Sequence, residues 1–162
     1  MEDIKTIRDK INDWLLDEGL TVSQREDEQA DFHLVIPDVS QGITADIIKP
    51  KNKYFLIIGI GIGIPPEVAR PYASLKDDEK QKFMLDVQKD LLIFQVDHRI
   101  EPNRNEPKLI AINDLIYIED ITRTSFMTSL KRVKFATLYL IWSINEKFSP
   151  QKGSSNPSSG YA

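Results

Sequence analysis

The chain has 162 residues, 41% hydrophobic and 28% charged, which is the size and balance of one folded domain with a substantial core. It contains no cysteine, so disulfides, thiolate catalysis and cysteine-bound metals are excluded. The net charge of −4 is uneven: residues 1–121 carry 24 acidic and 15 basic side chains, whereas residues 122–148 carry five basic and one acidic.

The N-terminal half predicts a helix followed by three strands. Apolar residues recur at steps of three and four over residues 3–18, the pattern of an amphipathic helix, and Gly19 follows as a left-handed cap. Residues 23–29 are charged and have no period, which indicates a loop. Strands are expected at 32–36, 43–49 and 54–64; short connections make them an antiparallel meander, and Pro65 and Pro66 stop the third strand.

The C-terminal half predicts two more helices with strands between them. Ser74 and Asp77 have the spacing of a capping box, which starts a helix that runs to about Gln95. Strands are expected near 97–101, at 108–112 and at 115–119, with Asn113 and Asp114 turning between the last two. A final helix with one apolar side ends at 148, and the serine- and proline-rich residues 149–162 predict a disordered tail.

This element order predicts a single α+β domain over residues 1–148. Strands grouped between helices favour an antiparallel sheet of about five strands with three helices, in the order α-β-β-β-α-β-β-α, whose helices cover one face. Trp14 and Trp142 fall in helical stripes and are expected in the core. The first residues lack the composition of a signal peptide, and the longest apolar run is shorter than the roughly 20 residues of a membrane helix. We therefore expect a cytoplasmic chain.

The most conspicuous motif is the alternation of glycine and isoleucine at Gly59, Gly61 and Gly63. A dinucleotide fingerprint needs G-x-G-x-x-G at a strand-to-helix turn with an acid about 20 residues on, and this spacing, inside a strand, does not fit it. Strand side chains alternate, so the isoleucines fill one face while the glycines leave the other bare. Because glycine weakens a strand, something is expected to approach this backbone closely: a helix of the same chain, a second subunit or a ligand, in that order.

Few other residues indicate chemistry. The two histidines, His33 and His98, lack metal-binding spacing and read as ordinary strand residues. Four acidic residues could gather for acid–base catalysis, although the first two lie on the solvated face of a helix: Asp86, Asp90, Asp97 and Glu101. We predict no catalytic, cofactor-binding or metal-binding residue.

The last predicted helix carries a basic face that includes Lys131, Arg132 and Lys134. This face is either an ordinary solvated helix surface or a site that attracts an acidic partner or phosphate. Nucleic-acid binding is disfavoured, because no aromatic residues interleave with these charges and the whole chain is acidic.

Three segments carry a family resemblance: IGIGIPPE at residues 60–67, the helix with KF at 82–83 and LL at 91–92, and IYIEDIT at 116–122. The chain resembles the DUF2299 type of uncharacterised archaeal proteins over about residues 3–148. The element order is also similar to type III secretion chaperones and YbjN-like proteins, although the 96–107 loop fits that layout poorly. The resemblance implies a small, often dimeric domain that binds another polypeptide.

The sequence therefore predicts a non-enzymatic, chaperone-like or adaptor module that binds a protein partner or itself as a homodimer. Its candidate interaction surface consists of Gly59, Gly61, Gly63, Lys131, Arg132 and Lys134. The alternative is a small-molecule or nucleotide-binding protein, or an enzyme, that uses the glycine-rich strand.

Overall fold

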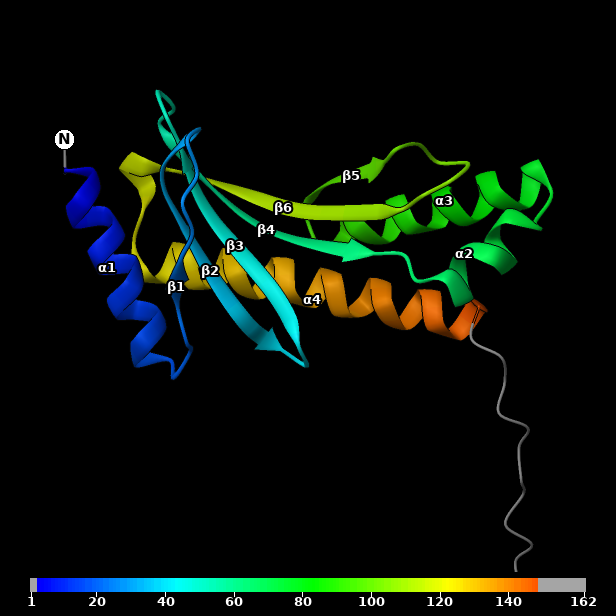
Figure 1. Ribbon diagram of the computed structural model, residues 1–162, viewed down its shortest axis with the longest axis horizontal. Coiled ribbons are helices and arrows are strands. Elements are labelled where there is room, and N and C mark those ends of the chain that lie inside the picture. The colour runs from blue at the N-terminus through cyan, green and yellow to red at the C-terminus, as the bar shows by residue number, and fades with distance from the viewer. Residues whose placement is uncertain (1–2, 149–162) are drawn as a thin grey trace, which may run out of the picture.

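The structure is a computed structural model that describes residues 3–148 (Figure 1). Its elements in chain order are α1 (Ile4–Asp17), β1 (Ser23–Gln24), β2 (Ala30–Ser40), β3 (Ile43–Pro50), β4 (Phe55–Gly63), α2 (Pro66–Ala73), α3 (Asp77–Ile93), β5 (Asp97–Glu101), β6 (Leu109–Tyr117), the 3-10 helix η1 (Ile118–Asp120) and α4 (Arg123–Phe148). The tail predicted to be disordered, residues 149–162, lies outside the described residues.

The strands form one twisted antiparallel sheet in the order β1-β2-β3-β4-β6-β5. The predicted α+β class is confirmed, with six strands and four α-helices over residues 3–148 rather than about five and three. Gly19 has the predicted left-handed conformation, with φ of 75° at the end of α1. No helix within these residues is long and apolar enough to cross a bilayer.

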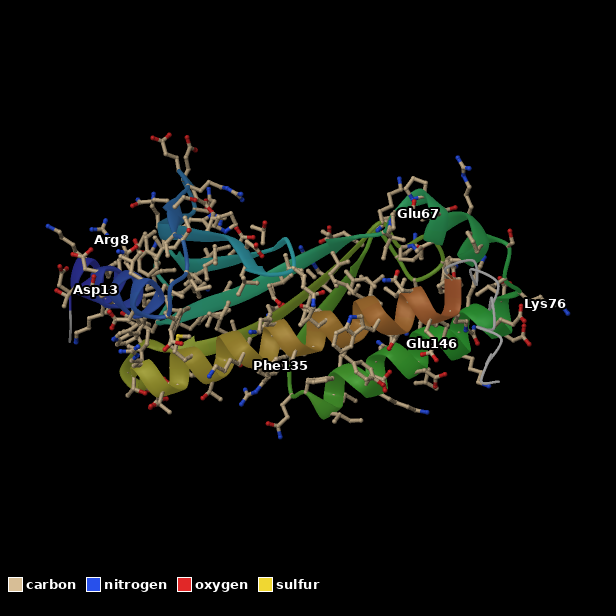
Figure 2. All side chains as sticks on the ribbon, turned by 90° about the horizontal axis from the view of Figure 1, so that it is seen from below. Arg8, Asp13, Glu67, Lys76, Phe135 and Glu146 are labelled. Carbon is tan, nitrogen blue, oxygen red and sulfur yellow. The ribbon has the colours of Figure 1, made fainter. Side chains whose placement is uncertain are left out.

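The hydrophobic core lies between the sheet and the helices, which cover one face of it (Figures 1 and 2). The helix α4 runs behind the central strands and buries Phe126, Val133 and Leu140 against them. From the sheet, alternate residues of each strand point into this core, as Ile58 does at 0% exposure. We call this the inner face of the sheet, and the opposite one, which looks toward the viewer in Figure 1, the outer face.

The predicted turn at Asn113 and Asp114 is wrong, because β6 runs unbroken through both residues. Asn113 pairs with Gly59 on one side and with Asp97 on the other. Asp114 points to the inner face, where Ser129 Oγ and Arg132 Nη1 of α4 donate to its Oδ2 at 2.8 and 2.9 Å. A side-chain partner from a distant helix thus satisfies the carboxylate, so the chain has no need to turn there.

Two helix predictions also need correction. β4 ends at Gly63, just before Pro65 and Pro66 as expected, but Pro66 also occupies the first turn of α2, where the missing N–H of proline costs nothing. The capping box at Ser74 and Asp77 is wrong: Ser74 ends α2, and the carboxylate that caps α3 belongs to Glu79, which accepts from the Lys76 N–H at 2.9 Å.

The two tryptophans differ in burial. Trp14 packs on the core, with its ring 6.0 Å from that of Phe126. Trp142 was predicted to be buried and is 57% exposed, because it lies on the side of α4 opposite the core residues Leu140 and Ile144.

Candidate functional site

The three glycines of β4 lie together on the outer face of the sheet, and we call them the glycine strip. They alternate with Ile58 and Ile60, which are at most 1% exposed on the inner face. The register places Gly59 opposite Asn113, Gly61 opposite Ala111 and Gly63 opposite Leu109. The alternation predicted from the sequence therefore exists, with one bare face and one filled face.

No helix within residues 3–148 covers the glycine strip, so the expectation that a helix of the same chain approaches it is wrong for these residues. A Cβ added at Gly59 would meet Asn113 Cβ and the Ile112 carbonyl oxygen at 3.7 Å, which is ordinary contact. At Gly61 it would meet the tip of Leu109 at 3.3 Å, and at Gly63 nothing lies within 4 Å. The described residues supply only neighbours from β6, and they leave Gly63 open.

Apolar side chains surround the glycine strip. Ile57 and Ala111 lie beside it on the outer face and are half-buried. Leu115, opposite Ile57, is 38% exposed, and Tyr117 at the end of β6 is 56% exposed. The outer face along β4 and β6 is thus mostly apolar, with Asn113 opposite Gly59 as a polar member, and β4 is exposed at Gly61 and Gly63.

One edge of β4 lacks a strand partner next to the glycine strip. β3 pairs with β4 only at Ile57, Ile58 and Gly59, after which the two strands diverge (Figure 1). Residues 60–63 of β4 pair with β6 alone among the described strands. An unpaired strand edge presents main-chain donors and acceptors, which favours the addition of another strand.

A polar cluster that sequence reasoning missed borders the other end of the strip. His33 is 6% exposed, its Nε2 lies 2.7 Å from Asp46 Oδ1, and its Nδ1 lies 3.3 Å from Asp27 Oδ2. Arg25 Nη1 donates to the same Asp46 oxygen at 3.4 Å. Asp46 pairs directly with Gly59, so the apolar surface ends at a carboxylate that already has cationic and imidazole neighbours. The cluster could not be read from spacing, since the pairing of β2 with β3 and the loop between β1 and β2 bring its members together.

The three basic candidates lie on α4, across the sheet from the glycine strip. Arg132 is bound to Asp114 and holds α4 to β6. Lys134 lies 5.1 Å from the centre of the Phe135 ring, and Lys131 is exposed. The six candidate residues therefore form two separate surfaces instead of one.

An exposed aromatic stripe on α4 is the second feature that the sequence prediction missed. Phe135, Tyr139 and Trp142 are 51%, 40% and 57% exposed and follow one another at helical spacing. Lys131 and Glu146 continue the same stripe at its two ends. We call these five residues the outer ridge of α4; Phe135 and Glu146 lie on the side of the helix away from the strands (Figure 2).

The cavities lie elsewhere. One of about 350 Å³ separates α3 from the loop joining β5 to β6, and its lining has two cations and no carboxylate: Lys80, Gln81, Met84, Leu85, Gln88, Arg104 and Asn105. Tyr72 Oη donates to the Arg104 carbonyl at 2.5 Å and anchors this loop. Burial lowers the pKa of the nearby His98, Arg104 lowers it further, and Asp97 opposes the shift. The glycine strip lines neither this cavity nor three others of 140 to 290 Å³.

Metal binding was not predicted, and the four acidic candidates are divided between two elements. Asp86 and Asp90 lie on α3, and Asp97 and Glu101 lie on β5. Within the part of the chain that the structure describes, no three histidine or acidic side chains group as metal ligands would.

Solved structures similar to this chain include the following two. A crystal structure of an uncharacterized protein from Methanothermobacter thermautotrophicus is 27% identical, with a TM-score of 0.81 over 87% of this chain and 98% of that one. A crystal structure of YbjN, a putative transcription regulator from E. coli, is 14% identical, with a TM-score of 0.49 over 83% of this chain and 90% of that one. A search of curated proteins gave no match.

The family comparison agrees with the resemblance seen in the sequence. The model of the family described as "Uncharacterized conserved protein (DUF2299)" matches residues 7–144, which extend from α1 to the last turns of α4. This match includes every strand of the sheet and both candidate surfaces. The chain therefore belongs to the DUF2299 family.

Proposed function

We propose that the chain is a non-enzymatic module that binds an extended segment of another polypeptide on the outer face of its sheet, along β4. The observation that carries the proposal is the glycine strip beside an unpaired strand edge. At Gly63 the fold leaves the space for a side chain empty, so the glycine serves no contact within the described residues. Glycine is used in strands where another backbone comes close.

Strand addition explains how such a surface binds. An added strand takes affinity from main-chain hydrogen bonds to the free edge and specificity from side chains that alternate over the sheet. Residues 60–63 supply the edge. Because Gly61 and Gly63 have no side chains, outer-face side chains of the added strand can extend over β4 toward Ala111 and Leu109 on β6.

The test compares two exposed valine substitutions on the same face. Gly63→Val adds a side chain where nothing lies within 4 Å, so it preserves the fold while obstructing the glycine strip. Arg99→Val, on the edge strand β5 beside Ala111, changes the outer face away from β4. Each tagged protein is used to capture partners from an extract of the source cells, with quantitative mass spectrometry. We expect a partner set shared by wild type and Arg99→Val and depleted about tenfold with Gly63→Val; equal capture by all three would contradict the proposal.

A thermal-shift assay distinguishes this proposal from the alternative, in which a nucleotide or small molecule binds the glycine strand. A ligand at 100 times its dissociation constant stabilises the folded state by about 2.7 kcal/mol, and about 1 kcal/mol raises the Tm of a chain of this size by 2–4 °C. ATP, GTP and NAD are the probes, with and without magnesium. We expect no shift; a shift that Gly63→Val abolishes would replace the polypeptide proposal with this one.

A further inference from the structure

We infer that two copies of the chain associate through the outer ridges of their α4 helices, packed antiparallel about a two-fold axis. This self-association uses a different surface from the proposed partner site and is independent of it. It rests on the exposure of the ridge and on the arrangement of its charges.

The ridge exposes more aromatic surface than a monomer needs. Phe135 and Trp142 are each more than half exposed, although α4 buries apolar residues on its opposite side. A large aromatic side chain buries 150–250 Å² when fully covered, so the three aromatics leave roughly 300 Å² open per copy. The largest apolar patch on a typical monomer measures about 300–600 Å² and is often functional, so the ridge is a candidate interaction surface that its charge arrangement has to support.

The order of residues along the ridge makes it complementary to itself. Phe135 and Trp142 are equally far from the peptide bond between Leu138 and Tyr139, and so are Lys131 and Glu146. In an antiparallel pair centred on that bond, Phe135 of each copy meets Trp142 of the other, and Lys131 meets Glu146. A two-fold interface requires this reciprocity, in which residue i contacts j and j contacts i.

The neighbouring charges leave this complementarity intact. Arg132 is engaged by Asp114 on the inner side, so it does not add to the positive end of the ridge. Lys147 follows Glu146, but its Nζ lies 4.6 Å from the ring centre of Phe83, toward α3, and so does not neutralise the negative end. One end of the ridge is therefore basic and the other acidic, which favours a second copy over a uniformly charged partner.

The position of α3 leaves room for this arrangement. Phe94, directly after α3, lies 5.5 Å from Tyr139, and Phe83 of α3 lies 5.1 Å from Phe148, both between ring centres. The helix α3 therefore flanks only the C-terminal half of α4 (Figure 2). The two-fold axis places the partner's α3 beside the N-terminal half of the ridge. The helix α1 also packs on this half of α4, but the contacts of Trp14 with Phe126 and of Asp17 with Arg123 lie N-terminal to the ridge, which begins at Lys131. The sheets of both copies then keep their outer faces free.

The test is sedimentation equilibrium of the full chain with reversed charges. Wild type is expected to be a concentration-dependent dimer of the 18.6 kDa chain, with a dissociation constant in the micromolar range because the aromatic area is below that of a standard interface of about 800 Å² per partner. Lys131→Glu places like charges together twice per dimer and should weaken it by about tenfold. The double variant Lys131→Glu with Glu146→Lys should recover the wild-type constant.

Two further variants keep the test decisive. Trp142→Ala removes the main aromatic contact and should leave a monomer, whereas Lys5→Glu, an equal charge change on α1, should leave the dimer unchanged. Circular dichroism confirms that each variant is folded, as expected for exposed positions. A wild-type monomer at about 1 mM, a double variant that fails to recover, or a dimer lost in Gly63→Val but kept in Trp142→Ala would each overturn the inference.

Discussion

Substituting alanine for each glycine of the glycine strip, and measuring the free energy of unfolding, tests whether the fold itself requires the glycines. Glycine within a strand destabilises by roughly 0.5–1 kcal/mol relative to alanine, because more conformational freedom is lost on folding. At Gly63 the new Cβ has no neighbour within 4 Å, and at Gly59 its nearest neighbours are at 3.7 Å. Both substitutions should therefore raise the free energy of unfolding by about 0.5–1 kcal/mol.

Gly61 provides the internal contrast in this series. Its added Cβ lies 3.3 Å from the Leu109 Cδ1 atom, the end of a flexible side chain on a half-buried residue. Leu109 has to shift by a few tenths of an ångström. The cost of this shift offsets the stability gained because alanine restricts the unfolded chain more than glycine does. We expect Gly61→Ala to stay within about 0.5 kcal/mol of wild type.

Urea unfolding followed by circular dichroism measures these changes, with an unchanged m value as the check that the transition is comparable. A gain at Gly63 and Gly59 together with a near-neutral Gly61 would agree with the structure. A loss above about 1 kcal/mol for Gly63→Ala would refute the reasoning, because it would mean that the fold needs a glycine there after all.

Three other predictions concern the framework of the sheet and helices. Arg132→Ala leaves the largely buried Asp114 carboxylate without its cation and should lower stability by about 1–3 kcal/mol in urea unfolding, whereas no loss would make the pair dispensable. Phe126→Ala empties a fully buried site and should cost about 3–5 kcal/mol by the same assay; a cost below 1 would contradict the packing. Burial and then Arg104 lower the pKa of His98, so the unfolded chain binds this proton more readily, and stability should fall as the pH drops through the ordinary value of 6.5. His98→Gln should flatten this dependence relative to wild type between pH 8 and 5, and an identical slope would contradict it.

Periodicity in the sequence correctly predicted the helices and strands that bury only one face. The three- and four-residue steps of the first helix and the alternation of the glycine-rich strand both reappear, as α1 and β4. Each of these elements buries one face, so the pattern of apolar residues follows the geometry directly.

Periodicity failed where tertiary contacts decide the outcome. Asn113 and Asp114 are typical of turns, yet β6 passes through them because Ser129 and Arg132 satisfy the carboxylate. Trp142 belongs to a helix that is apolar on several sides, since Leu138 is buried while Tyr139 next to it is exposed. Hydrophobicity alone cannot show which of these sides meets the sheet.

The sequence predicted the bare glycine face of the candidate surface but not the residues and elements around it. The bare glycine face could be derived from alternation, whereas the absence of a covering helix depends on the side of the sheet that the helices take. The His33 cluster and the pairing of Arg132 with Asp114 join residues that are 13 and 18 positions apart in sequence. Neither could be found without the register of the strands.

Site-specific photo-crosslinking from the outer face tests the proposed function most directly. A photoreactive residue replaces Ala111, which lies opposite Gly61, and in a matched chain it replaces Leu85, which is 50% exposed on α3. Both full-length proteins are irradiated in an extract of the source cells. The account predicts a discrete adduct with another polypeptide from position 111 that is absent from position 85 and lost when Gly63→Val is added. No adduct from position 111, or the same adducts from both positions, would contradict it.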